Sequence, residues 1–95
     1  MDINIAHTEK REMDMSIYPN PAQNNVNLNL DNMTEGNINI HILDMTGKIV
    51  RNIQQTVAQG YNVLVLDMAL PTGLYFVKVL SSDKQSMACK LQIIE

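Results

Sequence analysis

Apolar and polar residues alternate strictly along two stretches of this 95-residue sequence, and the alternation limits the fold more than any other feature. The runs NVNLNL at 25–30 and NINIHIL at 37–43 each place aliphatic side chains on one face of an extended chain. These side chains are Val26, Leu28 and Leu30 in the first run and Ile38, Ile40 and Ile42 in the second. No window repeats apolar residues at the spacing of an amphipathic helix, so we expect an all-β protein.

Turn signals separate these runs from further extended segments. The stretch DNMTEG between them carries a glycine and turn-forming side chains, which predicts a hairpin. We expect a short edge strand stopped by prolines at 15–23, and further strands at about 48–54, 61–68, 74–81 and 87–95. The run at 61–68 is apolar on both faces in its middle, which is typical of a strand in the interior of a sandwich.

The number and spacing of these segments indicate the fold class. About seven short strands with no crossover helix favour an antiparallel immunoglobulin-like β-sandwich, and a small antiparallel β-barrel is the alternative. The length suits one domain, which we assign to residues 15–95, with a linker or an added segment at 1–14. That segment lacks the basic start and apolar centre of a signal peptide. The chain is therefore either cytoplasmic or the terminal piece of a longer exported protein.

Charge and hydropathy exclude two classes of partner. The formal net charge is −3 and there is no basic cluster, which argues against nucleic-acid binding. No apolar stretch is long enough to span a membrane.

Two turns can be assigned from their residue types. Asp44 and Gly47 suit the first and fourth positions of a type I turn with a glycine bulge, where glycine takes a positive φ. The contiguous LPTG at 70–73 lacks the free residue of a cell-wall anchoring signal and is not followed by a membrane span. We expect a tight turn instead, in which Pro71 fixes φ and Gly73 relieves crowding where a strand begins.

Charge sets the register of the last two strands. Lys78 is expected to face water together with Phe76, which turns the intervening residues into the core, namely Tyr75, Val77 and Val79. A buried Tyr75 hydroxyl needs a hydrogen-bond partner, for example a backbone group. On the last strand, the alternation predicts that Cys89 is a small core residue on the same face as Met87, Leu91 and Ile93.

Side chains that would make the chain an enzyme are scattered. His7 falls in the linker and His41 on the asparagine-bearing face of a strand, and neither has a Cys, Asp or Glu at a metal-ligand spacing. Cys89 has no base on its own face. The acidic residues lie mainly at expected turns or strand ends, and they are Asp31, Glu35, Asp44, Asp67 and Asp83. We expect no catalysis, cofactor or metal, with a calcium site at a loop end as the alternative.

Four motifs follow one another along the chain. They are Tyr-Pro-Asn-Pro (Tyr18, Pro19, Asn20, Pro21), Asp-x-x-Gly at 44–47, Gly-x-Tyr at 73–75 and a Lys-apolar segment at 90–94. In this order they resemble the type A C-terminal sorting domain of type IX secretion, a sandwich module of proteins exported across the outer membrane of certain Gram-negative bacteria. The resemblance covers about residues 16–95.

The resemblance implies that the domain is a secretion signal and that the protein is secreted or lies at the cell surface. The implied partners are the type IX translocon, an outer-membrane shuttle protein and a sortase-like cysteine protease. In many members that protease removes the domain, here by a cut upstream of Tyr18, and can transfer the cargo to an anionic lipopolysaccharide. We hypothesise that recognition uses the last hairpin and the residues Gly73, Tyr75, Lys90, Leu91 and Ile93, because a terminal strand at a sheet edge exposes backbone donors.

Other interpretations stay open. Lys90, which is expected to point away from the Cys89 face, either meets an acidic partner or is a solvated charge that protects the edge. A different class of function is carbohydrate binding or adhesion through the asparagine rows, which consist of Asn25, Asn27 and Asn29 with Asn37 and Asn39. A third is a passive spacer.

Overall fold

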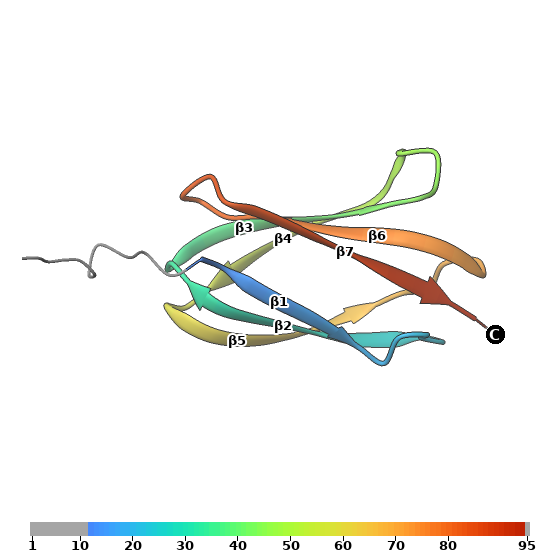
Figure 1. Cartoon of the computed structure of the whole chain (residues 1–95), viewed down its shortest axis with the longest axis horizontal. Coiled ribbons are helices and arrows are strands. Elements are labelled where there is room, and N and C mark those ends of the chain that lie inside the picture. The colour runs from blue at the N-terminus through green and yellow to red at the C-terminus, as the bar shows by residue number, and fades with distance from the viewer. Residues whose placement is uncertain (1–11, 95) are drawn as a thin grey trace, which may run out of the picture.

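The computed structural model describes residues 12–94, which form seven strands and no helix (Figure 1). The strands are β1 (Asp14–Tyr18), β2 (Asn25–Met33), β3 (Gly36–Leu43), β4 (Ile49–Val57), β5 (Gly60–Asp67), β6 (Gly73–Leu80) and β7 (Ser86–Ile93). Within these residues no helix could cross a membrane. The prediction of an all-β chain is confirmed.

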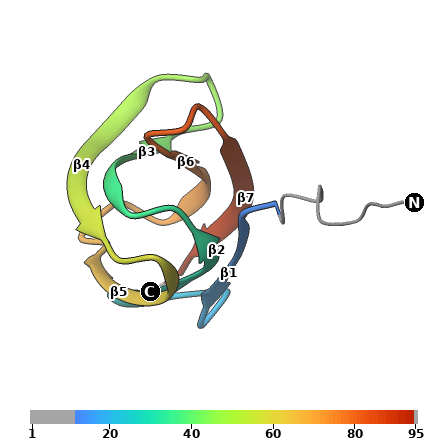
Figure 2. The same cartoon turned by 90° about the vertical axis from the view of Figure 1, so that its left-hand side faces the viewer.

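The strands form two antiparallel sheets packed face to face (Figures 1 and 2). The three-stranded sheet has the order β1-β2-β5, and the four-stranded sheet has the order β4-β3-β6-β7. The two sheets do not close into a barrel, so the predicted sandwich is confirmed over its alternative. β1 and β7 lie at neighbouring edges of the two sheets, as do β4 and β5 (Figure 2).

The core lies between the sheets and is built from alternate residues of the strands. The aliphatic side chains predicted to point inward on β2 and β3 are 0–1% exposed. Removing a Leu or Ile side chain from water contributes roughly 1.5–3 kcal/mol, so these two strands anchor the sandwich.

The hairpin predicted between β2 and β3 is wrong. β2 pairs with β1 and β5, whereas β3 pairs with β4 and β6 in the other sheet. Thr34 and Glu35 therefore cross from one sheet to the other. A strand with one apolar face buries that face equally well against a facing strand, and alternation alone does not distinguish this arrangement from lateral pairing.

The interior position predicted for the strand at 61–68 is also wrong. β5 is an edge strand of the three-stranded sheet. Its outward side chains Tyr61, Val63 and Val65 are 60%, 49% and 66% exposed, while Leu66 is 6% exposed. None of the strands of residues 12–94 forms another layer over the outer face of this sheet, so apolar residues on both faces of β5 do not place it in the interior.

The other boundaries differ by a few residues. β4 continues to Val57, beyond the expected end near Gln54, because its last residues pair with the start of β3 and Val57 is 2% exposed. At the start of the domain, Met13 is 5% exposed and its amide donates to Gln85 Oε1 at 3.0 Å. Among the described residues, core side chains therefore begin at Met13.

Candidate functional site

The last hairpin, β6–β7, forms one edge of the four-stranded sheet, and its side chains alternate as predicted. Tyr75, Val77 and Val79 are buried, whereas Lys78 is exposed on the same side as Phe76. On β7, Lys90 is exposed, while its neighbours Leu91 and Ile93 are 0% and 1% exposed. Lys90 therefore projects from a strand whose neighbouring side chains are fixed in the core.

The five hypothesised recognition residues are thus placed differently from one another. Lys90 is the one whose side chain is exposed, and Gly73 is half-buried. Tyr75 at 6% exposed, together with Leu91 and Ile93, lies in the core. In the folded domain these buried side chains shape the hairpin and do not present a contact surface.

A hydrogen bond from Tyr75 joins the start of β6 to the segment that precedes this strand. Its hydroxyl donates to the carbonyl oxygen of Pro71 at 2.7 Å, so the expected backbone partner is present. A tyrosine near the start of such a strand that bonds a few residues upstream is the tyrosine corner of immunoglobulin-like sandwiches. A Cβ added to Gly73 would lie 3.6 Å from Tyr75 Cε2, which is an ordinary contact. The expectation that Gly73 relieves crowding is therefore wrong.

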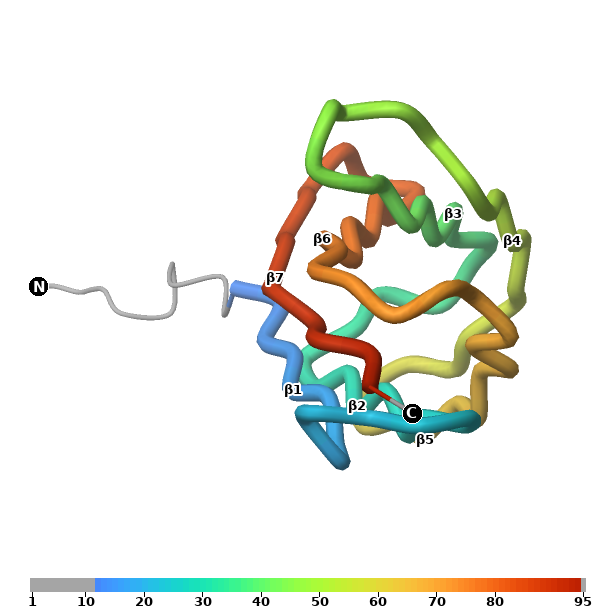
Figure 3. The backbone as a smooth tube through the Cα atoms, turned by 90° about the vertical axis from the view of Figure 1, so that its right-hand side faces the viewer, coloured from blue at the N-terminus to red at the C-terminus, as the bar shows by residue number. Residues whose placement is uncertain are grey.

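The loop at 19–24, called here the proline loop, is bonded to the end of β7 (Figure 3). Asn20 Nδ2 donates to the carbonyl of Lys90 at 3.0 Å, and Asn20 Oδ1 accepts from the amide of Gln92 at 3.0 Å. The Ala22 amide donates to the Gln92 carbonyl at 2.8 Å, and the Ala22 carbonyl accepts from the Ile94 amide at 2.8 Å. Both peptide bonds that precede the prolines of the loop are cis.

These bonds correct the expectation of an open edge at the end of the chain. Between Lys90 and Ile94, the backbone groups that face outward are taken by Asn20 and Ala22. A partner that adds a strand there would first have to displace the proline loop. The groups of this part of β7 that remain open to a partner are its outward side chains, Lys90 and Gln92.

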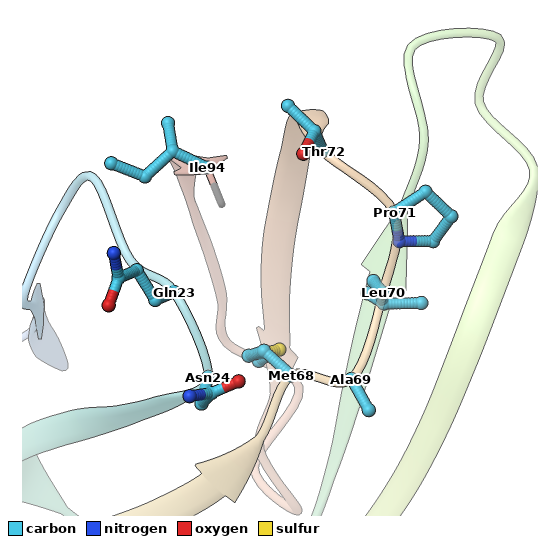
Figure 4. Close-up of a pocket in the computed structure, with 8 residues that line it drawn as sticks. All are labelled: Gln23, Asn24, Met68, Ala69, Leu70, Pro71, Thr72 and Ile94. Atoms are coloured by element: carbon cyan, nitrogen blue, oxygen red, sulfur yellow. The ribbon is translucent and has the colours of Figure 1, made fainter.

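An open cleft of about 380 Å³ lies beside this end of β7 (Figure 4). It is lined by Gln23, Asn24, Met68, Ala69, Leu70, Pro71, Thr72 and Ile94. Met68, which is 0% exposed, forms the floor, and Ile94 and Thr72 stand at the opposite side. None of the lining side chains titrates near neutral pH, so the cleft offers apolar contact and amide hydrogen bonds but no general acid or base.

The predicted turn between β3 and β4 is confirmed. The Gly47 amide donates to the Asp44 carbonyl at 3.0 Å, and Gly47 has φ 87°. Asp44 Oδ1 accepts from the Thr46 hydroxyl at 2.6 Å, the Thr46 amide at 2.9 Å and the Lys48 amide at 3.1 Å. These bonds, the Thr46 hydroxyl first, lower the pKa of the Asp44 carboxyl below its ordinary value because they favour the charged form.

Reactive groups elsewhere do not converge. Cys89 is half-buried on the inward side of β7, and desolvation raises the pKa of its thiol, which disfavours the nucleophilic thiolate. His41 lies on the outer face of the four-stranded sheet, opposite Asn52 and Lys78. Among residues 12–94, no group of three or more His, Cys, Asp or Glu is placed to hold a metal. His7 lies outside the described residues.

The asparagine rows do not form one surface. Asn25, Asn27 and Asn29 belong to β2, whereas Asn37 and Asn39 belong to β3 in the other sheet. Their outward faces lie on opposite sides of the sandwich, so a sugar cannot contact both rows at once. The sequence did not reveal this, because it depends on β2 and β3 crossing between sheets.

A polar network at the opposite end of the sandwich was missed from the sequence. Asp83 accepts hydrogen bonds from Ser81, Thr34 and Gln85, and these bonds, Ser81 first, lower the pKa of its carboxyl. The network joins the β2–β3 crossover to the β6–β7 turn, and Gln85 also bonds Met13. Only the polar composition of the SSDKQ segment hinted at a loop there.

The fold and this site define a small β-sandwich module whose last strand is fixed to its first loop. The chain belongs to the family described as the secretion system C-terminal sorting domain, whose model matches residues 16–95. Members of this family are C-terminal sorting signals of type IX secretion, which implies export across the outer membrane of Gram-negative bacteria. Searches of the curated proteins and of the solved structures gave no match.

Proposed function

We propose that a protein of the type IX machinery recognises the terminal strand of the folded domain. This recognition directs a joined cargo through the type IX translocon to the cell surface or the medium. The observation that carries the proposal is the position of Lys90. Its side chain is exposed, while the adjacent Leu91 is 0% exposed and the Lys90 carbonyl is bonded to Asn20. A charge held on a rigid strand is a better recognition feature than one on a mobile tail, because less conformational entropy is lost on binding.

The further partners are an outer-membrane shuttle protein and a sortase-like cysteine protease that cuts upstream of Tyr18. The chain joins the fold at Met13, next to Gln85 in the β6–β7 turn, whereas Ile94 lies beside the proline loop at the other end of β7 (Figure 1). A strand of this length spans about 25 Å. The linker site proposed for the protease and the end of β7 are therefore separated along the length of that strand.

We also infer that the domain itself is not catalytic. The cleft beside β7 is lined by amide, hydroxyl and apolar side chains, and the half-buried Cys89 is held in its thiol form by desolvation. Carbohydrate binding is less well supported, because the asparagine rows face opposite ways.

The test is export of a periplasmic reporter fused to residues 1–95 in a bacterium that has type IX secretion. Deleting residues 91–95 should leave the reporter in the periplasm. Because that deletion also removes core contacts, Lys90→Ala is compared with Leu91→Ala. Leu91→Ala should lower the free energy of unfolding by about 2–5 kcal/mol, whereas Lys90→Ala should change it by less than about 0.5 kcal/mol.

Loss of export in Lys90→Ala at unchanged stability supports recognition of the folded strand. Normal export of the 91–95 deletion would refute the proposal. A passive spacer makes a different prediction, because a spacer placed internally in the fusion should act as well as one placed at its end.

A further inference from the structure

The charged side chains on the strands are divided between the two sheets by sign. The strands of the three-stranded sheet carry the carboxylates Asp14, Asp31 and Asp67 and no Lys or Arg. The strands of the four-stranded sheet carry Arg51, Lys78 and Lys90 and no Asp or Glu. The formal net charge of −3 conceals this division of the charged strand residues between the two sheets.

The basic strand residues that face outward are Lys78 on β6 and Lys90 on β7. Arg51 is turned toward backbone carbonyls, with Nη2 donating to Ala69 at 2.8 Å. The register instead pairs Lys78 with Ala88 and Phe76 with Lys90, so the two lysines lie diagonally on adjacent strands, about 7–8 Å apart at their Cα atoms. We call Phe76, Lys78, Ala88 and Lys90 the lysine face.

The lysine face combines two positive charges with one partly exposed apolar side chain, that of Phe76. Phe76 is half-buried on the outer side of β6, next to the exposed Lys90. Among residues 12–94, neither ammonium group has a carboxylate on its own sheet to neutralise it. A ligand with carboxylates at matching spacing gains two charge-assisted contacts and covers Phe76 at the same time.

The chemistry of the occupant follows from the size and sign of this charge. Two lysines attract an anionic lipid surface by only about 1 kcal/mol each, which is too little for stable membrane binding. A nucleic acid would be repelled by a chain of net charge −3. A protein segment with acidic side chains beside an apolar one matches both the lysines and Phe76, and the acidic sheet on the far side repels it from the wrong face.

We propose that the lysine face is the docking surface for an acidic segment of a protein partner. This proposal rests on the proposed function, because the partner is the protein that recognises the domain for export. Docking uses the outer face of β6–β7 and leaves the proline loop bonded to the edge of β7. The pairing of Lys78 and Lys90 with carboxylates sets the orientation of the domain on that partner.

The test in cells is export of the reporter fusion with Lys78→Glu and Lys90→Glu combined. Export should fall by about tenfold or more, since attraction becomes repulsion at both positions. The matched control, Ser16→Glu with Val65→Glu, adds carboxylates at exposed positions of the three-stranded sheet and should export as the unaltered fusion does. A third variant, Lys78→Arg with Lys90→Arg, keeps the charges and should keep export. Thermal unfolding of each variant checks that the fold persists.

The outcomes separate the two proposals. If the unaltered fusion itself stays in the periplasm, the proposed function fails. If it is exported and the double charge reversal is exported equally well, neither the lysine face nor the Lys90 side chain is recognised, and the role of the domain as an export signal is then judged by the 91–95 deletion alone.

A binding measurement on the purified chain identifies the class of ligand. Adding poly-L-glutamate should shift the amide resonances of Phe76, Lys78, Ala88 and Lys90 in a salt-sensitive way, with little change on the three-stranded sheet. Shifts confined to other residues would overturn the assignment. Flotation with vesicles of equal parts phosphatidylglycerol and phosphatidylcholine is the counter-test, because binding that the charge reversal abolishes would identify a lipid and not an acidic protein.

Discussion

The hydroxyl of Tyr75 donates a hydrogen bond of 2.7 Å to the carbonyl oxygen of Pro71, and this bond joins the start of β6 to the segment that precedes it. Tyr75→Phe removes the donor and keeps the buried ring. We expect the free energy of unfolding to fall by about 1 kcal/mol, measured by urea denaturation. Tyr61→Phe is the control, because Tyr61 is 60% exposed and should show no change. Equal effects in both variants would contradict a specific role for the bond.

Asn20 contributes to the stability of the terminal strand through its side chain. Asn20→Ala removes the acceptor for the Gln92 amide and the donor to the Lys90 carbonyl. The hydrogen-exchange protection of Gln92 should fall by about five- to tenfold, while Ile94, which is bonded to Ala22, should lose less. Asn25→Ala, at an exposed position of β2, is the control. Unchanged protection of Gln92 would show that Ala22 alone holds the strand.

Gly36 lies where the β2–β3 crossover meets the β6–β7 turn. It has φ 150°, and a Cβ added there would lie 2.6 Å from Ser82 Oγ. Gly36→Ala should therefore cost about 1–3 kcal/mol of unfolding free energy through clash and backbone strain. Adding Ser82→Gly should recover the part due to the clash. Gly47→Ala, with φ 87° and nothing within 4 Å of the added Cβ, reports the strain alone. If Ser82→Gly recovers nothing, the clash is not the cause.

The Asp44 turn makes stability depend on pH. The folded pKa of Asp44 is lowered, chiefly by the Thr46 hydroxyl, so its contribution is present above the unfolded value of about 3.9 and is lost as pH falls through the lower folded value. Between pH 5 and pH 2, the melting temperature of the unaltered chain should fall more than that of Asp44→Asn, which keeps an acceptor oxygen but does not titrate. Parallel melting curves across this range would contradict the assignment.

Alternation in the sequence predicted most of the strands and nearly every inward side chain, because side-chain direction in an extended chain depends only on parity. It did not predict which strands pair. β2 and β3 were expected to form a hairpin and instead lie in facing sheets, and β5 was expected in the interior and lies at an edge. Both errors concern contacts between segments, and the local pattern carries no information on those.

The candidate site was predictable to the same extent. The outward position of Lys90 and the inward position of Leu91 follow from parity, and Tyr75 was expected to need a backbone partner. The bonds of Asn20 and Ala22 to β7 were not predictable, because they join residues about 70 positions apart in the sequence. Neither was the division of charge between the sheets, which is visible only once the strand order is known.

The bonds between the proline loop and β7 also bear on the order in which the domain can be completed as the chain is made. Asn20 and Ala22 precede their partners by about 70 residues, and the strands β2 to β6 lie between them in the sequence. The proline loop can therefore take its final position only after the outer strand of the four-stranded sheet has been made.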